Sequence, residues 1–106
     1  MDVTGCSNGS PDIKTGSGYG IRIKSKDRDL FFQKEWNSVE VIIDSEKFIE
    51  VSISKSFWNT CIELKSKEIG RWMLDNNHAP WPKYKTPKFK LEPSENRRFI
   101  LTNNQK

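Results

Sequence analysis

The sequence predicts a small α+β domain, mainly β, in which a partly open β-barrel or pseudobarrel carries two short helices. Three observations support this fold class. The chain has 106 residues, which is enough for one modest core. Short apolar segments with strand periodicity outnumber the segments with helical features. Only 34% of the residues are apolar, but four Trp, six Phe and two Tyr supply large areas to bury. We therefore expect a compact core built from a few large side chains.

The folded domain is expected to cover residues 19–102. Residues 1–18 are rich in Gly, Ser, Asn and Thr, with only Val3 and Ile13 as aliphatic residues beyond Met1. Such a segment buries too little apolar surface to offset the entropy of ordering it, so we expect a disordered N-terminal tail. Residues 103–106 are expected to form a short polar C-terminal tail.

The domain is predicted to begin with a strand followed by a helix. Residues 19–24 alternate apolar and polar side chains, which is typical of a half-buried strand. Ser25 offers a hydroxyl oxygen as the N-cap of a helix over residues 26–34. The side chains of this helix that are expected to face the core are Leu30, Phe31 and Phe32.

Two hairpins are predicted later in the chain. Residues 39–43 form an almost continuous apolar run, and residues 48–54 alternate apolar and polar side chains after a polar turn. Residues 88–92 and 97–101 flank a second turn and contribute the second pair of strands.

Between the hairpins the sequence predicts a helical turn and a longer helix. The turn covers residues 56–60, and Ser66 caps a helix over residues 67–76. Three apolar residues at i, i+3 and i+4 spacing form its expected buried stripe: Ile69, Trp72 and Met73. A glycine inside a helix costs about 1 kcal/mol relative to alanine, so Gly70 suggests that a strand or another helix approaches this helix closely.

Residues 79–90 are the most informative segment. They read A-P-W-P-K-Y-K-T-P-K-F-K, with three prolines, three aromatic residues and four lysines, and no acid. Proline excludes a helix or a central strand, so we expect a stiff, extended loop. Lysine neutralises phosphate and an aromatic ring can stack on an unpaired base, so this loop is suited to contact nucleic acid. The alternative is a proline-rich connection whose aromatic residues cap the core.

The net charge of +4 is concentrated in the second half of the chain. Residues 61–106 hold ten Lys and Arg against five Asp and Glu, whereas residues 18–60 are neutral and residues 1–17 carry a net charge of −1. This asymmetry indicates a polyanionic partner, either nucleic acid or an anionic membrane surface.

The predicted contact residues follow from the loop and its basic surroundings. Lysines and arginines would neutralise phosphates, and the side chains of Trp81 and Tyr84 would stack on bases or insert between them. The primary set is Arg71, Trp81, Lys83, Tyr84, Lys85, Lys88, Lys90, Arg97 and Arg98. The secondary set is Lys24, Lys26, Arg28, Lys65 and Lys67.

The sequence predicts no catalytic, metal or cofactor site. His78 is the single histidine, and no acid or cysteine is spaced to make it part of a triad or a metal site. Cys61 has apolar neighbours and Cys6 lies in the predicted tail, so a disulfide framework is not indicated. Because no signal-peptide core and no membrane-length apolar run is present, we expect a soluble intracellular protein.

The chain resembles the DNA-binding pseudobarrel family, which includes the DNA-binding domains of plant auxin-response transcription factors and effector or target-recognition domains of some restriction enzymes. The resemblance is carried by V-S-I-S-K-S-F-W-N-T-C, by the helix around Ile69–Trp72, and by the strand at 89–91. It covers residues 19–101 through element order and aromatic placement. It implies a barrel that grips the DNA major groove with two loop-borne arms. The corresponding segments are the loop after the first strand, with Lys24, Lys26 and Arg28, and the later basic loop.

The sequence therefore predicts a non-catalytic domain that binds nucleic acid, DNA in preference to RNA, with the proline-rich loop and the adjacent hairpin on the phosphate backbone. The alternative is a protein-interaction module or a subunit of a larger assembly. A small RNA-cleaving or RNA-modifying enzyme is a third possibility, which would require Glu68, Asp75 or His78 to converge on the basic face.

Overall fold

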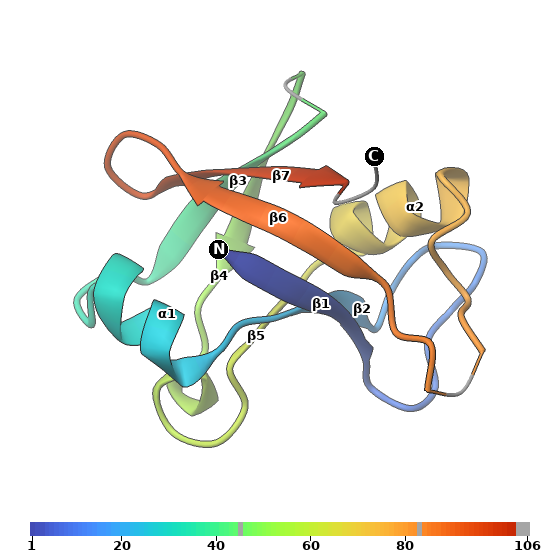
Figure 1. Cartoon of the computed structure of the whole chain (residues 1–106), viewed down its shortest axis with the longest axis horizontal. Coiled ribbons are helices and arrows are strands. Elements are labelled where there is room, and N and C mark those ends of the chain that lie inside the picture. The colour runs from blue at the N-terminus through green and yellow to red at the C-terminus, as the bar shows by residue number, and fades with distance from the viewer. Residues whose placement is uncertain (45, 83, 104–106) are drawn as a thin grey trace.

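The domain is mainly β: its sheet curls into a nearly closed barrel, and one short helix lies at each end of the barrel (Figure 1). The computed structural model describes residues 1–44, 46–82 and 84–103. The strands among these residues are β1 (Asp2–Ser7), β2 (Tyr19–Arg22), β3 (Ser38–Ile43), β4 (Lys47–Ser52), β5 (Glu63–Lys65), β6 (Lys88–Pro93) and β7 (Arg98–Asn103). The helices are α1 (Ser25–Phe31) and α2 (Lys67–Asp75), with a 3-10 turn η1 at Lys55–Trp58.

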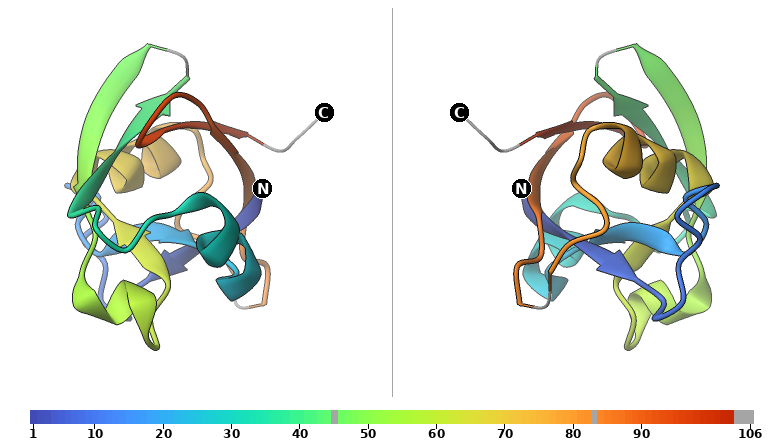
Figure 2. Two further views of the ribbon diagram at one scale, coloured as in Figure 1. Left: turned by 90° about the vertical axis from the view of Figure 1, so that its left-hand side faces the viewer. Right: turned by 90° about the vertical axis from the view of Figure 1, so that its right-hand side faces the viewer.

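The strand order explains the barrel shape. The seven described strands are arranged β4-β3-β7-β6-β1-β2-β5, and neighbours are antiparallel except for the parallel pair β3 and β7. The two outer strands, β4 and β5, come back towards each other, so the sheet encloses the core seen end-on in Figure 2. The predicted fold class is confirmed.

The prediction of a disordered tail over residues 1–18 is wrong. Residues 2–7 form β1, which lies between β6 and β2 with Val3 opposite Phe89 and Gly5 opposite Ile21. The Val3 side chain is buried in the core. Composition failed as a guide here because a strand with partners on both sides is held by backbone hydrogen bonds, which polar residues make equally well.

Residues 8–18 are also ordered, as a loop that returns to the start of β2. The amide of Asn8 donates to the carbonyl of Gly18 at 3.0 Å, and the amide of Gly16 donates to the carbonyl of Asp12 at 2.8 Å. The domain therefore begins well before Tyr19. At the other end Asn103 belongs to β7, and residues 104–106 of the predicted C-terminal tail lie outside the described residues.

Helix α1 differs from its prediction in length and in orientation. It ends at Phe31, and Phe32 continues in an extended conformation. The Phe32 ring therefore enters the core, where it stacks on Phe99 with 4.6 Å between the ring centroids. Leu30 and Phe31 are exposed, and α1 has no buried residue. The expectation that Leu30 and Phe31 face the core is thus wrong.

The other predicted elements agree with the structure. Helix α2 begins after Ser66, whose hydroxyl oxygen accepts a hydrogen bond from the Glu68 amide at 3.1 Å. Both hairpins form, with Val39 opposite Val51 in one and Leu91 opposite Leu101 in the other. The stripe of α2 is buried: Ile69, Trp72 and Met73.

A close approach does occur at Gly70, but it is made by Gly16 of the loop between β1 and β2 and not by a strand or helix as predicted. A Cβ atom added to Gly70 would lie 1.9 Å from the carbonyl oxygen of Gly16. A Cβ atom on Gly16 would lie 2.4 Å from the amide nitrogen of Arg71. The two glycines therefore let the loop pack directly on the backbone of α2.

This contact predicts a specific loss of stability. Gly16 and Gly9 both have φ near +90°, but a Cβ atom at Gly9 would meet nothing within 4 Å. Gly16→Ala adds a clash with backbone to the same conformational strain, so it should lower the free energy of unfolding by about 1–3 kcal/mol more than Gly9→Ala. Urea unfolding of both variants measures the difference. Equal losses would contradict the packing of this loop on α2.

Candidate nucleic-acid interface

The strand order brings together two basic segments that are far apart in the sequence. On the outer surface of the barrel, Thr4 of β1 lies opposite Arg22 of β2 on one side and opposite Lys88 of β6 on the other. Asp2 lies opposite Lys90, and Lys24 follows two residues after Arg22. The segment predicted to be a tail is therefore the strand that joins the two basic segments.

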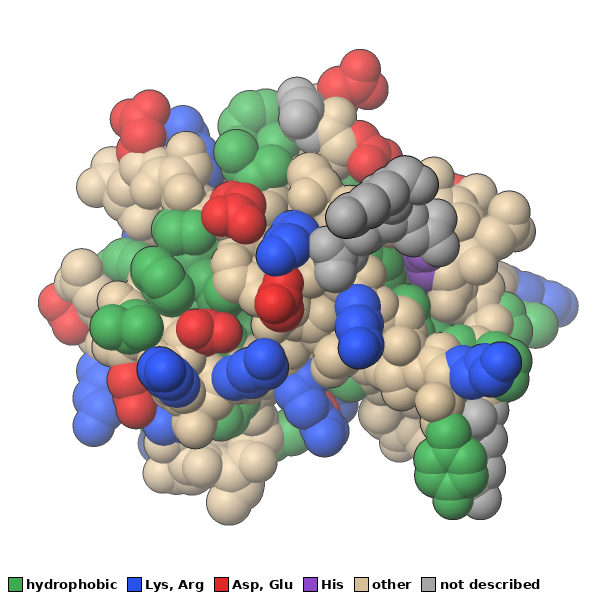
Figure 3. Space-filling model, viewed as in Figure 1, with side chains coloured by type: hydrophobic (Ala, Val, Ile, Leu, Met, Phe, Trp, Pro, Cys, Tyr) green, Lys and Arg blue, Asp and Glu red, His purple; other side chains and the backbone are tan. Residues whose placement is uncertain are grey.

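We call this surface the lysine face. It consists of the outward charged side chains of β6, β1, β2 and β5 and of Lys24, two residues beyond the end of β2. Its members are Asp2, Arg22, Lys24, Glu63, Lys65, Lys88, Lys90 and Glu92. Figure 3 shows Lys and Arg side chains in a row across this side of the molecule, with Asp and Glu side chains beside several of them.

Asp2 is the acid at the centre of the face. Its carboxylate lies 2.6 Å from the Lys90 ammonium nitrogen. The hydrogen bond and the charge of Lys90 lower the pKa of Asp2, and the charge of Lys24 lowers it further. Lys90 thus pairs with Asp2, and Lys24, which lies beyond the end of β2, keeps its positive charge on the face.

Glu63 is the second acid, and it is buried beneath the face. Its carboxylate is 3.0 Å from Arg22 Nε and 3.0 Å from Lys65 Nζ, and it accepts a hydrogen bond from Cys61 Sγ at 3.0 Å. Burial raises the pKa of Glu63, but these hydrogen bonds outweigh the burial and hold the pKa at about 2. Glu63 is therefore ionised at neutral pH and fixes the Arg22 and Lys65 side chains in place.

Both cysteines lie next to Glu63 and are held as thiols. Burial and the negative charge of Glu63 raise the pKa of Cys6 to about 12. The hydrogen bond from Cys61 to Glu63 raises the pKa of Cys61. The thiolate is the nucleophilic form, so neither side chain is arranged for covalent catalysis at neutral pH.

Several lysines at the lysine face and its borders have no acidic partner. Lys24, Lys26, Lys85 and Lys88 are exposed and make no ion pair with any residue in the described ranges. Lys26 lies in the first turn of α1, and Lys85 lies in the proline-rich loop that leads into β6. These two positions extend the basic surface beyond the sheet.

The aromatic residues of the proline-rich loop divide into two kinds. Trp81 is half-buried, with its ring centroid 5.6 Å from that of Tyr19, and it packs above Gly5. The Gly5 amide also donates to the Pro87 carbonyl at 2.9 Å, so β1 holds both ends of the loop. Tyr84, in contrast, is 91% exposed at the loop tip. Lys83, which was predicted as a contact, lies outside the described residues.

Three of the predicted arginines lie away from the lysine face and are bound to acids. Arg97 donates to Glu50 at 3.0 Å and to the Ser38 carbonyl at 3.2 Å, and Arg98 binds Glu40. These pairs join β7 to β3 and β4. Arg71 binds Asp75 at 2.9 Å and donates to the carbonyl of Lys14. The structure does not bring these three arginines together with the lysines.

The secondary residues are also divided. Lys24, Lys26 and Lys65 lie on or beside the lysine face, as described above. Arg28 donates to the Phe57 carbonyl at 3.2 Å and its guanidinium lies 5.5 Å from the centre of the Trp58 ring, so it joins α1 to η1. Lys67 is exposed on α2.

His78 is half-buried and packs against two aromatic rings of the core. Its ring centroid lies 5.3 Å from that of Trp72 and 5.0 Å from that of Phe89. Burial lowers the pKa of His78, although the charge of Asp44 opposes this shift. The side chain is therefore a neutral packing group at neutral pH.

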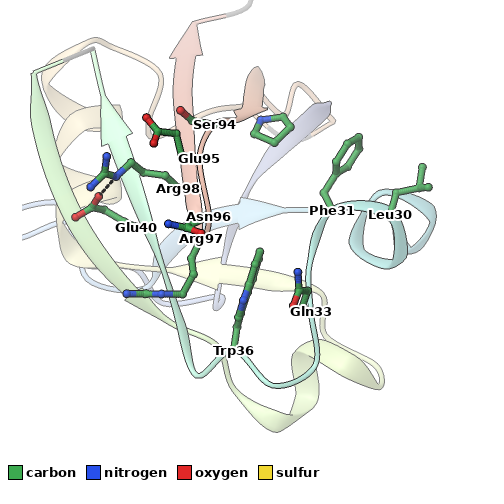
Figure 4. Close-up of a pocket in the computed structure, with 11 residues that line it drawn as sticks. Leu30, Phe31, Gln33, Trp36, Glu40, Ser94, Glu95, Asn96, Arg97 and Arg98 are labelled. Carbon is green, nitrogen blue, oxygen red and sulfur yellow. Dashed lines mark hydrogen bonds and ion pairs between the residues drawn. The ribbon is translucent and has the colours of Figure 1, made fainter.

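Sequence reasoning missed a groove between α1 and the β6–β7 turn, which we call the α1–turn groove (Figure 4). Its volume is about 840 Å³. One wall comes from α1 and the segment after it, and the other comes from the turn and β3. The lining residues are Leu30, Phe31, Gln33, Trp36, Glu40, Pro93, Ser94, Glu95, Asn96, Arg97 and Arg98. The run of Leu30, Phe31 and Phe32 could have indicated it, because one short helix cannot turn three consecutive residues inward.

Comparisons with protein-family models, with curated proteins and with solved structures found no match. In the described part of the chain, no helix has the length and apolar character needed to cross a membrane. The same residues contain no group of three or more His, Cys, Asp or Glu side chains that could hold a metal ion.

The low pKa of Glu63 predicts a pH dependence of stability. A carboxylate whose pKa is lowered by folding stabilises the native state above its unfolded pKa, and this stabilisation is lost as pH falls towards the folded value of about 2. Glu63→Gln should therefore be less stable than the parent by about 2 kcal/mol at neutral pH, and the difference should shrink between about pH 5 and pH 2.

Urea unfolding as a function of pH measures this difference. Glu35→Gln is the matched control, because Glu35 is exposed and has no ion pair within the described ranges. A gap between Glu63→Gln and the parent that stays constant from neutral to acid pH would show that Glu63 is not held as a stabilised carboxylate.

Proposed function

We propose that this domain binds nucleic acid through the lysine face, contacting phosphates and catalysing no reaction. One observation carries the proposal: Thr4 of β1 is paired with Arg22 of β2 on one side and with Lys88 of β6 on the other, so basic residues far apart in the sequence lie on one surface. The two basic segments predicted as separate arms thus form one surface. A strand of phosphates that crosses β6, β1 and β2 could meet lysines from both.

The charges of this surface support a polyanionic ligand. Five cations of the lysine face stand against three carboxylates. Of these, Glu63 is occupied beneath the surface by Arg22 and Lys65, and Glu92 is paired with the Met1 ammonium group. Lys24 and Lys88 remain without an acidic partner among the described residues, and Lys26 and Lys85 continue the surface on either side. When exposed ammonium groups neutralise phosphates, they displace the cations condensed on the nucleic acid, and the release of these counterions drives association.

The fold supports DNA as the preferred polymer. A nearly closed barrel with two short helices is compatible with the DNA-binding pseudobarrel family that the sequence resembles. The two arms implied by that resemblance correspond to the start of α1, with Lys24 and Lys26, and to the proline-rich loop, with Tyr84 and Lys85. Because nucleic acids are found inside the cell, this function also favours an intracellular location.

Binding of labelled DNA and RNA oligonucleotides, followed by fluorescence anisotropy, tests this function. With about four phosphate contacts, the affinity should fall about a hundredfold between about 50 and about 200 mM salt. The double variant Lys24→Glu, Lys88→Glu removes one contact from each segment and adds repulsion, so it should weaken binding by more than about tenfold at the lower salt concentration.

Lys47→Glu is the matched control, because Lys47 is an exposed lysine on β4, at the far edge of the sheet order from β1. It should change the affinity by less than about threefold, because it alters only the net charge of the protein and no contact. Absence of binding to every oligonucleotide at low salt would contradict the proposal. The proposal would also be contradicted if the affinity changed little with salt and if Lys47→Glu weakened binding as much as the double variant of the lysine face. The protein-interaction alternative would then be preferred.

A further inference from the structure

The α1–turn groove has an apolar wall that the fold does not need. Leu30 is 66% exposed and Phe31 is 37% exposed, while the adjacent Phe32 fills the core. Trp36 stands beside them, half-buried, with its ring edge-on to Phe32 and Phe99. Large apolar side chains grouped at one hollow usually mark a binding site, because leaving them in water gains nothing for the monomer.

The opposite wall offers hydrogen bonds but little free charge. In Figure 4, Trp36 is seen between Gln33 on the α1 side and Asn96 and Arg97 on the side of the turn. Arg97 is bound to Glu50 and Arg98 to Glu40, so their charges are largely neutralised. Glu95, on the same turn, would repel a phosphate. The groove therefore suits a flat, uncharged group with donors and acceptors at its edge.

The groove adjoins the proposed phosphate surface along α1. Lys26 and Leu30 are four residues apart on this helix, so their side chains are neighbours on one helix face. Lys26 lies two residues after Lys24 of the lysine face, and Leu30 lines the groove. A polymer strand that leaves the lysine face along α1 thus passes the mouth of the groove.

We propose that the α1–turn groove binds an unpaired base of a nucleic-acid strand whose phosphates lie on the lysine face. This inference rests on the proposed function and names its preferred substrate as single-stranded nucleic acid. The base stacks against the Phe31 and Trp36 wall, and the amides of Gln33 and Asn96 meet its hydrogen-bonding edge. A base inside a duplex is stacked and paired, so it cannot enter the groove without leaving the helix.

The test compares a single-stranded DNA oligonucleotide of about twelve nucleotides, its duplex, and the same strand with abasic sites. Fluorescence anisotropy gives the three affinities for the parent, for Phe31→Ala and for Ile13→Ala. Ile13 is the matched control, because it is 61% exposed and lies outside the groove lining. Both replaced side chains are exposed, and urea unfolding of each variant verifies that the fold is intact.

The parent should bind the single strand about tenfold more tightly than the duplex or the abasic strand. Phe31→Ala should remove most of that preference and leave duplex binding within about twofold, because the phosphate contacts persist. Ile13→Ala should change none of the three affinities.

Two results separate failure of this inference from failure of the proposed function. If Phe31→Ala has no effect while Lys24→Glu with Lys88→Glu still weakens binding by more than about tenfold, the lysine face stands and the base site is overturned. The apolar wall would then be assigned to a protein contact. If no oligonucleotide binds the parent, the proposed function itself fails and the base site fails with it.

Discussion

The pairing of β1 with two neighbours is the constraint on which the rest of this structure depends. Without β1, the order β4-β3-β7-β6-β1-β2-β5 would separate into a four-stranded sheet and a two-stranded ribbon of β2 and β5. A two-stranded ribbon is marginally stable in water at best. The strand therefore closes the barrel and sets the distance between the two basic segments, although it contributes few apolar side chains to the core.

The same segment positions the parts that flank it. Gly5 lets Pro87 and Trp81 approach the backbone of β1, which fixes the proline-rich loop. The loop that follows β1 packs Gly16 against Gly70 and is held to α2 by Arg71 through the Lys14 carbonyl. Small residues at these contacts allow backbone to meet backbone, and this explains why an apparently weak N-terminal sequence is ordered.

The sequence pattern predicted the elements whose formation depends on their own residues. The two hairpins and α2 could be predicted because alternation, helical spacing and the Ser66 cap are properties of single segments. β1 and the three-residue β5 could not, because their stability comes from partners elsewhere in the chain. The orientation of α1 was also beyond the sequence, since the early end of the helix at Phe31 decides which neighbouring side chain turns inward.

The candidate site was predicted in part for the same reason. The lysines of the proline-rich loop and of the segment after β2 could be identified as basic from sequence alone. Their common face depends on strand order, which the sequence pattern does not contain. Strand order also brings Arg97 next to Glu50 of β4 and Arg98 next to Glu40 of β3. These two arginines therefore form ion pairs within the protein, whereas the unpaired lysines keep their charge for a ligand.

Whether β1 joins the two basic segments into one binding surface can be measured by following the backbone amide resonances by NMR while a single-stranded DNA oligonucleotide is added. If β1 does so, the largest shifts form one contiguous surface, from Lys24 across Thr4 to Lys88, with further shifts at Phe31. Shifts at only one of the two basic segments, or shifts centred on β4 or α2, would show that β1 does not join the lysines into a single binding surface.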